Sequence, residues 1–162
     1  MKLDVGGMAK GYAGDEAVAA MRAGGCGSCL FEAGGDIVLG DPPPGRIGWA
    51  IAFQNGRRLE LSNCGVAASG DTSQYVIIGG TRYSHVVDPR TGIGLTSRVA
   101  TNVIATEGAV SDGLATAASA MGRGPGQKLT DSWPGAWGWM RILSDPPQPQ
   151  PRPRGFRDRG LL

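Results

Sequence analysis

The stretch Ser111-Asp-Gly-Leu-Ala-Thr116 has residue types that could bind a metal ion. If this stretch is helical, Asp112 and Thr116 stand four residues apart, so their oxygen atoms face the same side of the helix. Carboxylate and hydroxyl oxygens are ligands that a hard cation such as Mg²⁺ prefers. The alternative, an aspartate on a solvated helix face without a ligand, stays open at this point.

A second candidate lies near the amino terminus, in Asp4-Val-Gly-Gly-Met-Ala-Lys-Gly11. Glycines allow the backbone to approach a ligand closely, and Lys10 could meet a phosphate group near the start of a helix. An ordinary glycine-rich start of a helix would explain the same residues without any ligand.

The single histidine, His85, lies in Arg82-Tyr-Ser-His-Val-Val-Asp-Pro-Arg-Thr-Gly92. Imidazole side chains change charge near neutral pH and can act as general bases. A packed or exposed histidine without a catalytic role is the alternative. The dipeptide Asp88-Pro89 is typical of a turn, so a turn without a catalytic role is the alternative for Asp88.

Two further stretches could contribute polar groups to a site. Ala68-Ser-Gly-Asp71 predicts a turn in which Ser69 or Asp71 touches a ligand or caps the turn. Cys26-Gly-Ser-Cys29 has the spacing of a redox or zinc motif, but the chain has only three cysteines and no second pair. We interpret Cys26 and Cys29 as small buried residues between a helix and a strand.

Two helices are expected to position these groups. The first spans residues 8–23, with Met8, Tyr12, Ala19 and Met21 on its buried side. The second spans residues 107–121 and is closed by Gly122.

Strands are expected between the two helices, with hairpin turns at Asn55-Gly56 and Gly79-Gly80. The expected strands are 28–32, 37–39, 47–53, 58–61, 74–78, 82–87 and 98–105. This order of elements predicts an α+β domain with a largely antiparallel sheet and flanking helices.

Glycine accounts for 28 of the 162 residues, against an average share of about 7% in proteins. No repeat indicates a fibre, and recurring apolar runs up to residue 143 argue against disorder. The composition therefore indicates tight turns and close backbone contact with a ligand.

The charged residues are balanced over most of the chain. Residues 144–162 contain four of the 16 basic and two of the 14 acidic residues, which leaves twelve of each in residues 1–143. A neutral body gives no support for nucleic acid as a partner. Residues 144–162 are rich in proline and arginine, and we expect them to form a disordered tail.

Five of these stretches resemble, in order and approximate spacing, the ApbE family, the FAD:protein FMN transferases. They are Asp4-Val-Gly-Gly-Met-Ala-Lys-Gly-Tyr-Ala13, Glu32-Ala-Gly-Gly-Asp-Ile37, Ser69-Gly-Asp71, Arg82 to Gly92 and Ser111 to Thr116. The resemblance runs from residue 3 to about residue 122. It implies an ApbE-like, T-fold-like α+β fold that is incomplete here, with residues 1–143 as the carboxy-terminal part of a flavin transferase domain.

Similar proteins bind FAD and Mg²⁺, attach FMN through a phosphoester to a threonine or serine of a target protein, and release AMP. By this resemblance, Mg²⁺ would be held by Asp112, Thr116 and the carbonyl of Gly7. FAD, the substrate, would be contacted by Asp4, Lys10, Asp36, Ser69 and the backbone of Val86. His85 is expected to position or deprotonate the acceptor hydroxyl, and Asp88 is expected to take part in catalysis.

Two other functions remain open for a chain of this kind. One is hydrolysis of FAD to FMN and AMP with water as the acceptor, and the other is a flavin-binding fragment without turnover.

The chain departs from the family pattern at both ends. It opens inside the first motif, so we expect that the intact protein has a preceding segment roughly as large again. Similar proteins continue after the last helix into a further strand, whereas here Trp133 to Trp139 is expected to lead into the tail, as after a frameshift near residue 144. The resemblance implies a periplasmic or cell-envelope location for the intact protein, with membrane association only through the preceding segment.

Overall fold

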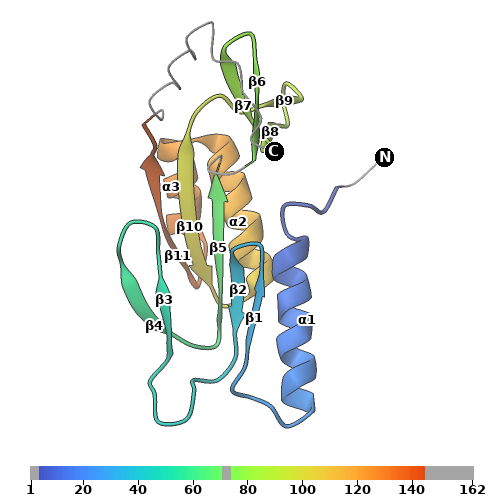
Figure 1. Cartoon of the computed structure of the whole chain (residues 1–162), viewed down its shortest axis with the longest axis vertical. Coiled ribbons are helices and arrows are strands. Elements are labelled where there is room, and N and C mark those ends of the chain that lie inside the picture. Colours follow the sequence, from blue (N-terminus) through green and yellow to red (C-terminus); the bar gives the residue numbers. More distant parts are fainter. Residues whose placement is uncertain (1–3, 71–73, 145–162) are drawn as a thin grey trace, which may run out of the picture.

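A computed structural model describes residues 4–70 and 74–144, and its centre is a five-stranded sheet (Figure 1). The strand order is β1-β2-β5-β10-β11, and every neighbouring pair is antiparallel. The strands are β1 (Leu30–Ala33), β2 (Asp36–Leu39), β5 (Cys64–Gly70), β10 (Val99–Ala105) and β11 (Ala136–Ile142). The expected α+β class with an antiparallel sheet is confirmed.

Three helices cover one face of this sheet: α1 (Ala9–Ala23), α2 (Gly108–Met121) and α3 (Arg123–Ser132). Side chains alternate between the two faces of a strand, so every second residue of β10 points toward α2. Val103 packs with Leu114 and Ala115 of α2, and the Ser119 hydroxyl donates a hydrogen bond to Thr101 Oγ1 at 2.9 Å. The side chains on this face form the part of the core that lies between the sheet and the helices.

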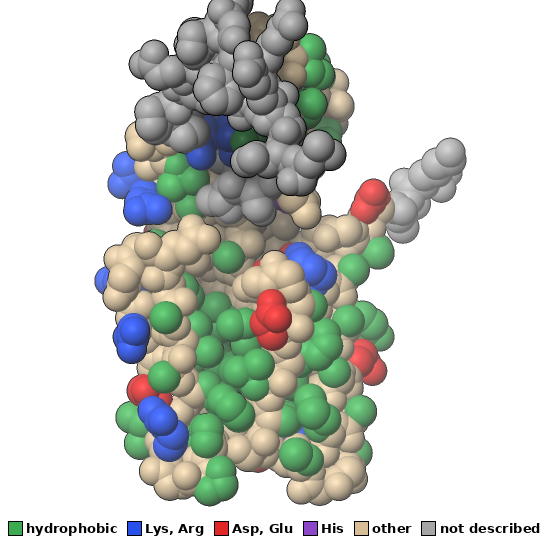
Figure 2. Space-filling model, viewed as in Figure 1, with side chains coloured by type: hydrophobic (Ala, Val, Ile, Leu, Met, Phe, Trp, Pro, Cys, Tyr) green, Lys and Arg blue, Asp and Glu red, His purple; other side chains and the backbone are tan. Residues whose placement is uncertain are grey.

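The opposite face is partly covered by the hairpin of β3 (Trp49–Ala52) and β4 (Arg58–Leu61). Ile51 and Phe53 pack there with Ile104 of β10, and Phe53 meets Trp139 edge-to-face with ring centroids 4.7 Å apart. Figure 2 shows apolar side chains gathered over the lower half of this face, beside the hairpin. The hairpin expected around Asn55-Gly56 is therefore confirmed.

Two small hairpins lie beyond one end of the sheet: β6 (Tyr75–Ile78) with β7 (Thr81–Ser84), and β8 (Val87–Asp88) with β9 (Ile93–Gly94) (Figure 1). The expected turn at Gly79-Gly80 is confirmed, since both glycines have positive φ, 57° and 79°. The strand that was expected over residues 82–87 corresponds to β7, which ends at Ser84. Beyond β6 the chain pairs elsewhere: the Ser84 N–H donates to the carbonyl of Leu95 at 2.8 Å, and Leu95 directly follows β9.

Four elements were not expected from the sequence: β5, β9, α3 and β11. The expected turn at residues 68–71 is wrong for residues 68–70, which end β5, while Asp71 lies outside the described residues. Strand β11 pairs with β10 over its whole length, so the segment after Trp133 forms an edge strand instead of leading directly into a tail. The expected disordered tail lies outside the described residues from 145 onward.

The packed face of α1 also differs from the expectation. Gly11, Gly14 and Val18 are buried, whereas Met8 and Tyr12 are 44% and 57% exposed. Small residues face inward because the helix lies very close to its neighbours: a Cβ on Gly14 would lie 2.5 Å from Val38 Cγ2. Cys29 is buried as expected, but Cys26 is exposed.

No helix within residues 4–70 and 74–144 is long and apolar enough to cross a membrane.

Candidate functional site

Lys10 lies between two buried carboxylates, and we call Lys10, Asp36 and Asp112 the Lys10 cluster. The Lys10 Nζ atom is 2.6 Å from Asp36 Oδ2 and 3.5 Å from Asp112 Oδ1. Asp36 and Asp112 are only 5% and 3% exposed, while the lysine side chain is 43% exposed. In this cluster the Lys10 ammonium group is partly exposed to solvent, and two buried carboxylates hold it in place.

The members of the cluster come from three elements that meet at the same end of the fold. Lys10 is in the first turn of α1, Asp36 is the first residue of β2, and Asp112 is in the first half of α2. Backbone N–H groups fix both carboxylates: Gly11 N–H donates to Asp112 Oδ2 at 3.1 Å, and Ala68 N–H donates to Asp36 Oδ1 at 3.1 Å. The site therefore depends on the packing of α1, α2, β2 and β5.

The charges in the cluster shift two pKa values. Burial disfavours the charged form of Lys10, but hydrogen bonds and attraction from Asp36 and Asp112 outweigh it and raise the pKa of Lys10. Burial raises the pKa of Asp36, and the hydrogen bonds from Lys10 and Ala68 offset part of that effect. Lys10 is consequently a permanent cation at neutral pH.

We expect Lys10→Met to destabilise the fold in a pH-dependent way. Without the lysine, the folded-state pKa of Asp36 rises further above its ordinary value of 3.8. The loss is therefore small below about pH 4, where unfolded aspartates are protonated, and grows toward neutral pH to about 1–2 kcal/mol. Urea unfolding at several pH values measures it. In the parent chain the contribution of Lys10 is present below pH 10.5 and is lost as the pH rises through its raised pKa.

The control for this variant is Lys128→Met, at an exposed lysine of α3. It should leave the unfolding free energy within about 0.5 kcal/mol of the parent at every pH. An equal loss at pH 3 and pH 7 for Lys10→Met would contradict the electrostatic explanation.

Gly7 and Thr116 lie together, and Thr116 is one helical turn from Asp112 of this cluster. A Cβ on Gly7 would be 3.0 Å from Thr116 Cγ2 and 3.5 Å from its hydroxyl, so the backbone at Gly7 runs directly along the Thr116 side chain. Thr116 is half-buried and lies one turn after Asp112 on the same side of α2. This donor set, a carboxylate, a hydroxyl and a nearby backbone carbonyl, fits the hard oxygen ligands that Mg²⁺ prefers. The described residues contain no group of three or more His, Cys, Asp or Glu side chains that could hold a metal.

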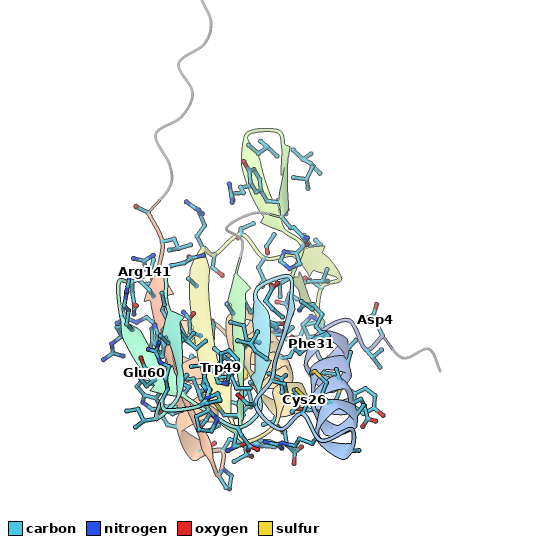
Figure 3. All side chains as sticks on the ribbon, turned by 60° about the horizontal axis from the view of Figure 1, so that its bottom comes forward. Asp4, Cys26, Phe31, Trp49, Glu60 and Arg141 are labelled. Carbon is cyan, nitrogen blue, oxygen red and sulfur yellow. The ribbon has the colours of Figure 1, made fainter. Side chains whose placement is uncertain are left out.

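Ser69 directly follows a residue that contacts the cluster, whereas Asp4 lies ahead of α1. Ser69 follows Ala68, the residue that donates to Asp36, and lies opposite Thr101 in the sheet. Asp4 is exposed ahead of α1, where its carboxylate accepts from Gly6 N–H at 2.7 Å (Figure 3). Both oxygens of Asp36 are engaged by the chain, so Asp36 holds Lys10, and its direct contact with FAD stays a prediction.

His85, Val86 and Asp88 form a separate group between β7 and β9. The His85 ring is exposed, and its Nδ1 lies 3.1 Å from the Gln74 carbonyl. A carbonyl can only accept, so Nδ1 carries the proton and Nε2 is the free acceptor in the neutral ring. No hydrogen bond or ion pair joins these residues to the Lys10 cluster in the described part of the chain.

Val86 and Asp88 already have partners in the chain. Val86 N–H donates to Ser84 Oγ at 3.1 Å, and its carbonyl accepts from Leu95 N–H at 2.9 Å. Asp88 accepts from the backbone and the guanidinium of Arg90, and the side-chain hydrogen bond lowers the pKa of its carboxyl. Asp88 thus holds the turn before β9, and its catalytic role stays a prediction, as does the contact of Val86 with FAD.

Sequence reasoning missed two residues that build the site. Asp15 of α1 accepts hydrogen bonds from Gly108 N–H at 2.7 Å and Ala109 N–H at 2.9 Å, so it caps the start of α2 from another helix. Gly11 brings the two helices into contact, because a Cβ there would collide with the carbonyl of Gly108. Local spacing gives no signal for a cap that comes from 93 residues away.

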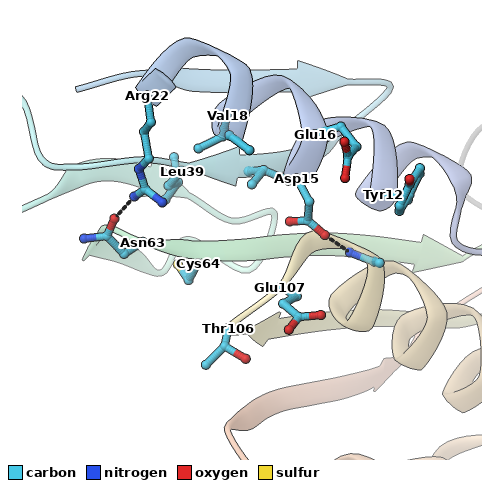
Figure 4. Close-up of a pocket in the computed structure, with 13 residues that line it drawn as sticks. Tyr12, Asp15, Glu16, Val18, Arg22, Leu39, Asn63, Cys64, Thr106 and Glu107 are labelled. Carbon is cyan, nitrogen blue, oxygen red and sulfur yellow. Dashed lines mark hydrogen bonds between the residues drawn. The ribbon is translucent and has the colours of Figure 1, made fainter. Parts of the chain in front are cut away.

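A cavity of about 360 Å³ lies beside this cap, between α1 and the start of α2 (Figure 4). Its walls include Tyr12, Asp15, Arg22, Cys64 and Glu107. Burial raises the pKa of the Cys64 thiol to about 11. The thiol is therefore protonated at neutral pH and is a poor nucleophile. The cavity does not include the Lys10 cluster.

The match to known sequences decides the family. Residues 1–136 match the sequence model of the ApbE family. The chain belongs to the ApbE family. A FAD:protein FMN transferase of Rhodobacter capsulatus is 33% identical over 144 residues, which cover 83% of this chain and 25% of that protein. One from Vibrio cholerae is 28% identical over 139 residues, covering 80% of this chain and 42% of that protein.

Solved ApbE structures share the fold. The apo form of the Pseudomonas stutzeri flavinyl transferase ApbE matches with a TM-score of 0.77 and 30% identity, over 89% of this chain and 47% of that one. The Thermotoga maritima ApbE protein matches with a TM-score of 0.74 and 32% identity, over 85% and 47%. This ApbE chain thus spans less than half the length of these relatives.

Proposed function

We propose that the protein to which this ApbE chain belongs transfers FMN from FAD to a threonine or serine hydroxyl of an acceptor protein. The observation that carries the proposal is the Lys10 cluster with Gly7 and Thr116 beside it, in a chain whose relatives are named FAD:protein FMN transferases. In the reaction, the acceptor oxygen bonds to the FMN phosphorus, the pyrophosphate P–O bond breaks, and AMP leaves.

The cluster has the charges that such a step requires. Phosphoryl transfer depends mainly on positioning and on neutralising charge at the oxygens around phosphorus. Lys10 is a partly exposed cation whose ammonium group Asp36 and Asp112 hold in place, so it can meet a pyrophosphate without first being ordered. Asp4 and Ser69 are proposed as further contacts for FAD.

We propose that Mg²⁺ is held by Asp112, Thr116 and the carbonyl of Gly7. When bound, this ion supplies positive charge next to the pyrophosphate. The Asp112 carboxylate is held in place, because one oxygen accepts a hydrogen bond from Gly11 N–H and the other lies 3.5 Å from Lys10 Nζ, so Mg²⁺ would share this second oxygen with Lys10.

His85 is proposed to accept the proton of the acceptor hydroxyl at Nε2. We expect His85→Ala to slow FMN transfer about a hundredfold, the usual scale for loss of a general base. The side chain is exposed, so thermal unfolding should be unchanged. Rates are measured from the mass of the acceptor at fixed times, with FAD binding followed by fluorescence. Full transfer by His85→Ala would rule out this role.

The decisive experiment incubates the chain with FAD, Mg²⁺ and a protein domain that carries an acceptor threonine, and then weighs the products. A gain of one FMN on the acceptor supports the proposal. Free FMN and AMP without modified acceptor would indicate hydrolysis of FAD instead. If neither product forms, the chain is a flavin-binding fragment without turnover.

A further inference from the structure

The hairpin of residues 75–84, which we call the β6–β7 arm, has an uncharged and apolar tip. Residues 74–81 are eight consecutive exposed residues, and none of them carries a charge. Tyr75, Val76, Ile77 and Ile78 are 47%, 53%, 60% and 63% exposed, so the exposed fraction rises from the base of the arm toward its turn. Figures 1 and 3 show the arm projecting from the body of the fold. Exposed apolar surface of this kind is typical of a contact with a partner or a membrane.

Apolar side chains occupy both faces of the arm. Successive residues of a strand point to opposite faces, so Tyr75 and Ile77 lie on one face, and Val76 and Ile78 lie on the other. Tyr83 is the cross-strand partner of Val76 and therefore shares its face. The surface of a protein partner would cover one of these faces, whereas the apolar part of a bilayer surrounds an inserted hairpin on both.

The side chains along the arm follow the layers of a membrane surface. Tyr75 and Tyr83 lie in the half of the arm nearer the base, and Ile77, Ile78 and the Gly79-Gly80 turn lie at the tip. Tyrosine rings are enriched at the level of lipid headgroups, and aliphatic side chains favour the hydrocarbon. This order from base to tip favours a bilayer as the occupant.

Arg82 is the one charged residue of the arm, and its position fits the same arrangement. It lies opposite Ile77 in the hairpin, but its guanidinium group is 3.2 Å from the centre of the Tyr75 ring, toward the base. A long arginine side chain can keep its charge at headgroup level while its methylene groups lie in apolar surroundings. The tip can therefore enter the bilayer without taking this charge with it.

The length and the hydrogen bonding of the arm limit it to the membrane surface. A strand of four residues such as β6 is about 13 Å long, which is enough to reach the boundary between headgroups and acyl chains at a depth of about 5–10 Å. Among the described strands only β7 pairs with β6, so the other edge of β6 needs water or headgroup oxygens for its backbone groups. The arm is thus suited to the interface and not to spanning the bilayer.

We propose that the tip of the β6–β7 arm, residues 76–81, inserts into the interfacial layer of a lipid bilayer and holds the protein against it. Burial of Val76, Ile77 and Ile78 supplies the driving force. The inference does not depend on FMN transfer, and it concerns the described chain and not the preceding segment expected above.

The first test measures flotation of the full chain with vesicles of neutral phosphatidylcholine. The chain should float with the vesicles. About 1 M salt should leave the bound fraction unchanged, because charges are then screened beyond about 3 Å whereas apolar burial persists. Absence of flotation, or its loss in high salt, would overturn the proposal.

The second test compares two isoleucines of equal exposure. Ile78 is 63% exposed at the tip of the arm, and Ile142 is 62% exposed on β11. Ile78→Asn should weaken vesicle binding about tenfold, because the burial of one aliphatic side chain is lost. Ile142→Asn should leave binding unchanged, and thermal unfolding checks that both variants keep the fold. Equal binding by the two variants would overturn the proposal.

The third test locates the contact by nuclear magnetic resonance with a nitroxide-labelled lipid in the vesicles. The amide signals of residues 76–81 should broaden more than those of residues 24–29, which follow α1 at the opposite end of the fold (Figure 1). Equal broadening of both groups would overturn the proposal. Broadening of the arm signals that depends on protein concentration, without lipid, would also overturn it in favour of contact between two copies of the chain.

Discussion

Asp112→Asn is expected to lower FMN transfer about a thousandfold, because several kcal/mol of charge stabilisation at the pyrophosphate depend on this carboxylate. The substitution removes one negative charge but keeps the shape. The amide oxygen of the asparagine can still accept from Gly11 N–H, now 3.1 Å from Asp112 Oδ2. The fold should therefore survive. The rate is measured from the FMN mass gained by the acceptor, and Mg²⁺ binding by calorimetry.

The control for this variant is Asp131→Asn on α3. Asp131 is exposed and accepts a hydrogen bond from Gln127 at 2.8 Å, outside the site. It should leave both transfer and Mg²⁺ binding unchanged. If Asp112→Asn kept parental Mg²⁺ affinity, Asp112 would not be a ligand, even if the rate fell.

Gly11→Ala is expected to destabilise the protein by about 3 kcal/mol, near the upper end for overpacking. The added Cβ would collide with the carbonyl of Gly108, which is backbone and cannot rotate away as a side chain could. Relief requires α1 and α2 to separate. That movement would also stretch the bond from Gly11 N–H to Asp112, so transfer should fall together with stability. Thermal and urea unfolding measure the first effect.

Gly113→Ala provides the matched control within a helix. A Cβ at Gly113 in α2 would meet only Met8 Cβ, at an ordinary contact distance of 3.9 Å. Alanine is a better helix former than glycine, so this change should stabilise the fold by about 0.5–1 kcal/mol. Parental stability of Gly11→Ala would show that the two helices do not approach as closely as described.

The expected effects of these substitutions on transfer rate and stability follow from how the site is built. Gly11 carries no functional group, yet it sets the distance between the helix that bears Lys10 and the helix that bears Asp112. Asp15 contributes from the same helix by capping α2. Positioning residues and reacting residues therefore share one interface, and stability measurements must accompany every rate.

The elements that the sequence predicted well have strong local signals. Helix α2 was expected over residues 107–121 and is found at Gly108–Met121, closed by Gly122 with φ of 80°. The hairpins at Asn55-Gly56 and Gly79-Gly80 follow from turns whose glycines need positive φ. These features depend on neighbours in the chain, so a single sequence contains them.

Strand β5 shows why other elements were missed. Its sequence, Cys64-Gly-Val-Ala-Ala-Ser-Gly70, has small residues and only one strong strand former. It is nevertheless central, because small side chains let α2 lie close: a Cβ on Gly65 would be 2.6 Å from Gly108 N. Strand β11 is likewise fixed by its pairing with β10 and not by its own sequence.

The sequence by itself determined the α+β class, the family resemblance and the residue types of the candidate site, because these follow from local propensity and from motifs in order. Only the tertiary structure decided that Lys10 lies between Asp36 and Asp112 and that Gly7 lies beside Thr116. Those relations join residues 26 to 109 positions apart in the chain. Their distances are set by how closely helices and strands pack, which no local pattern records.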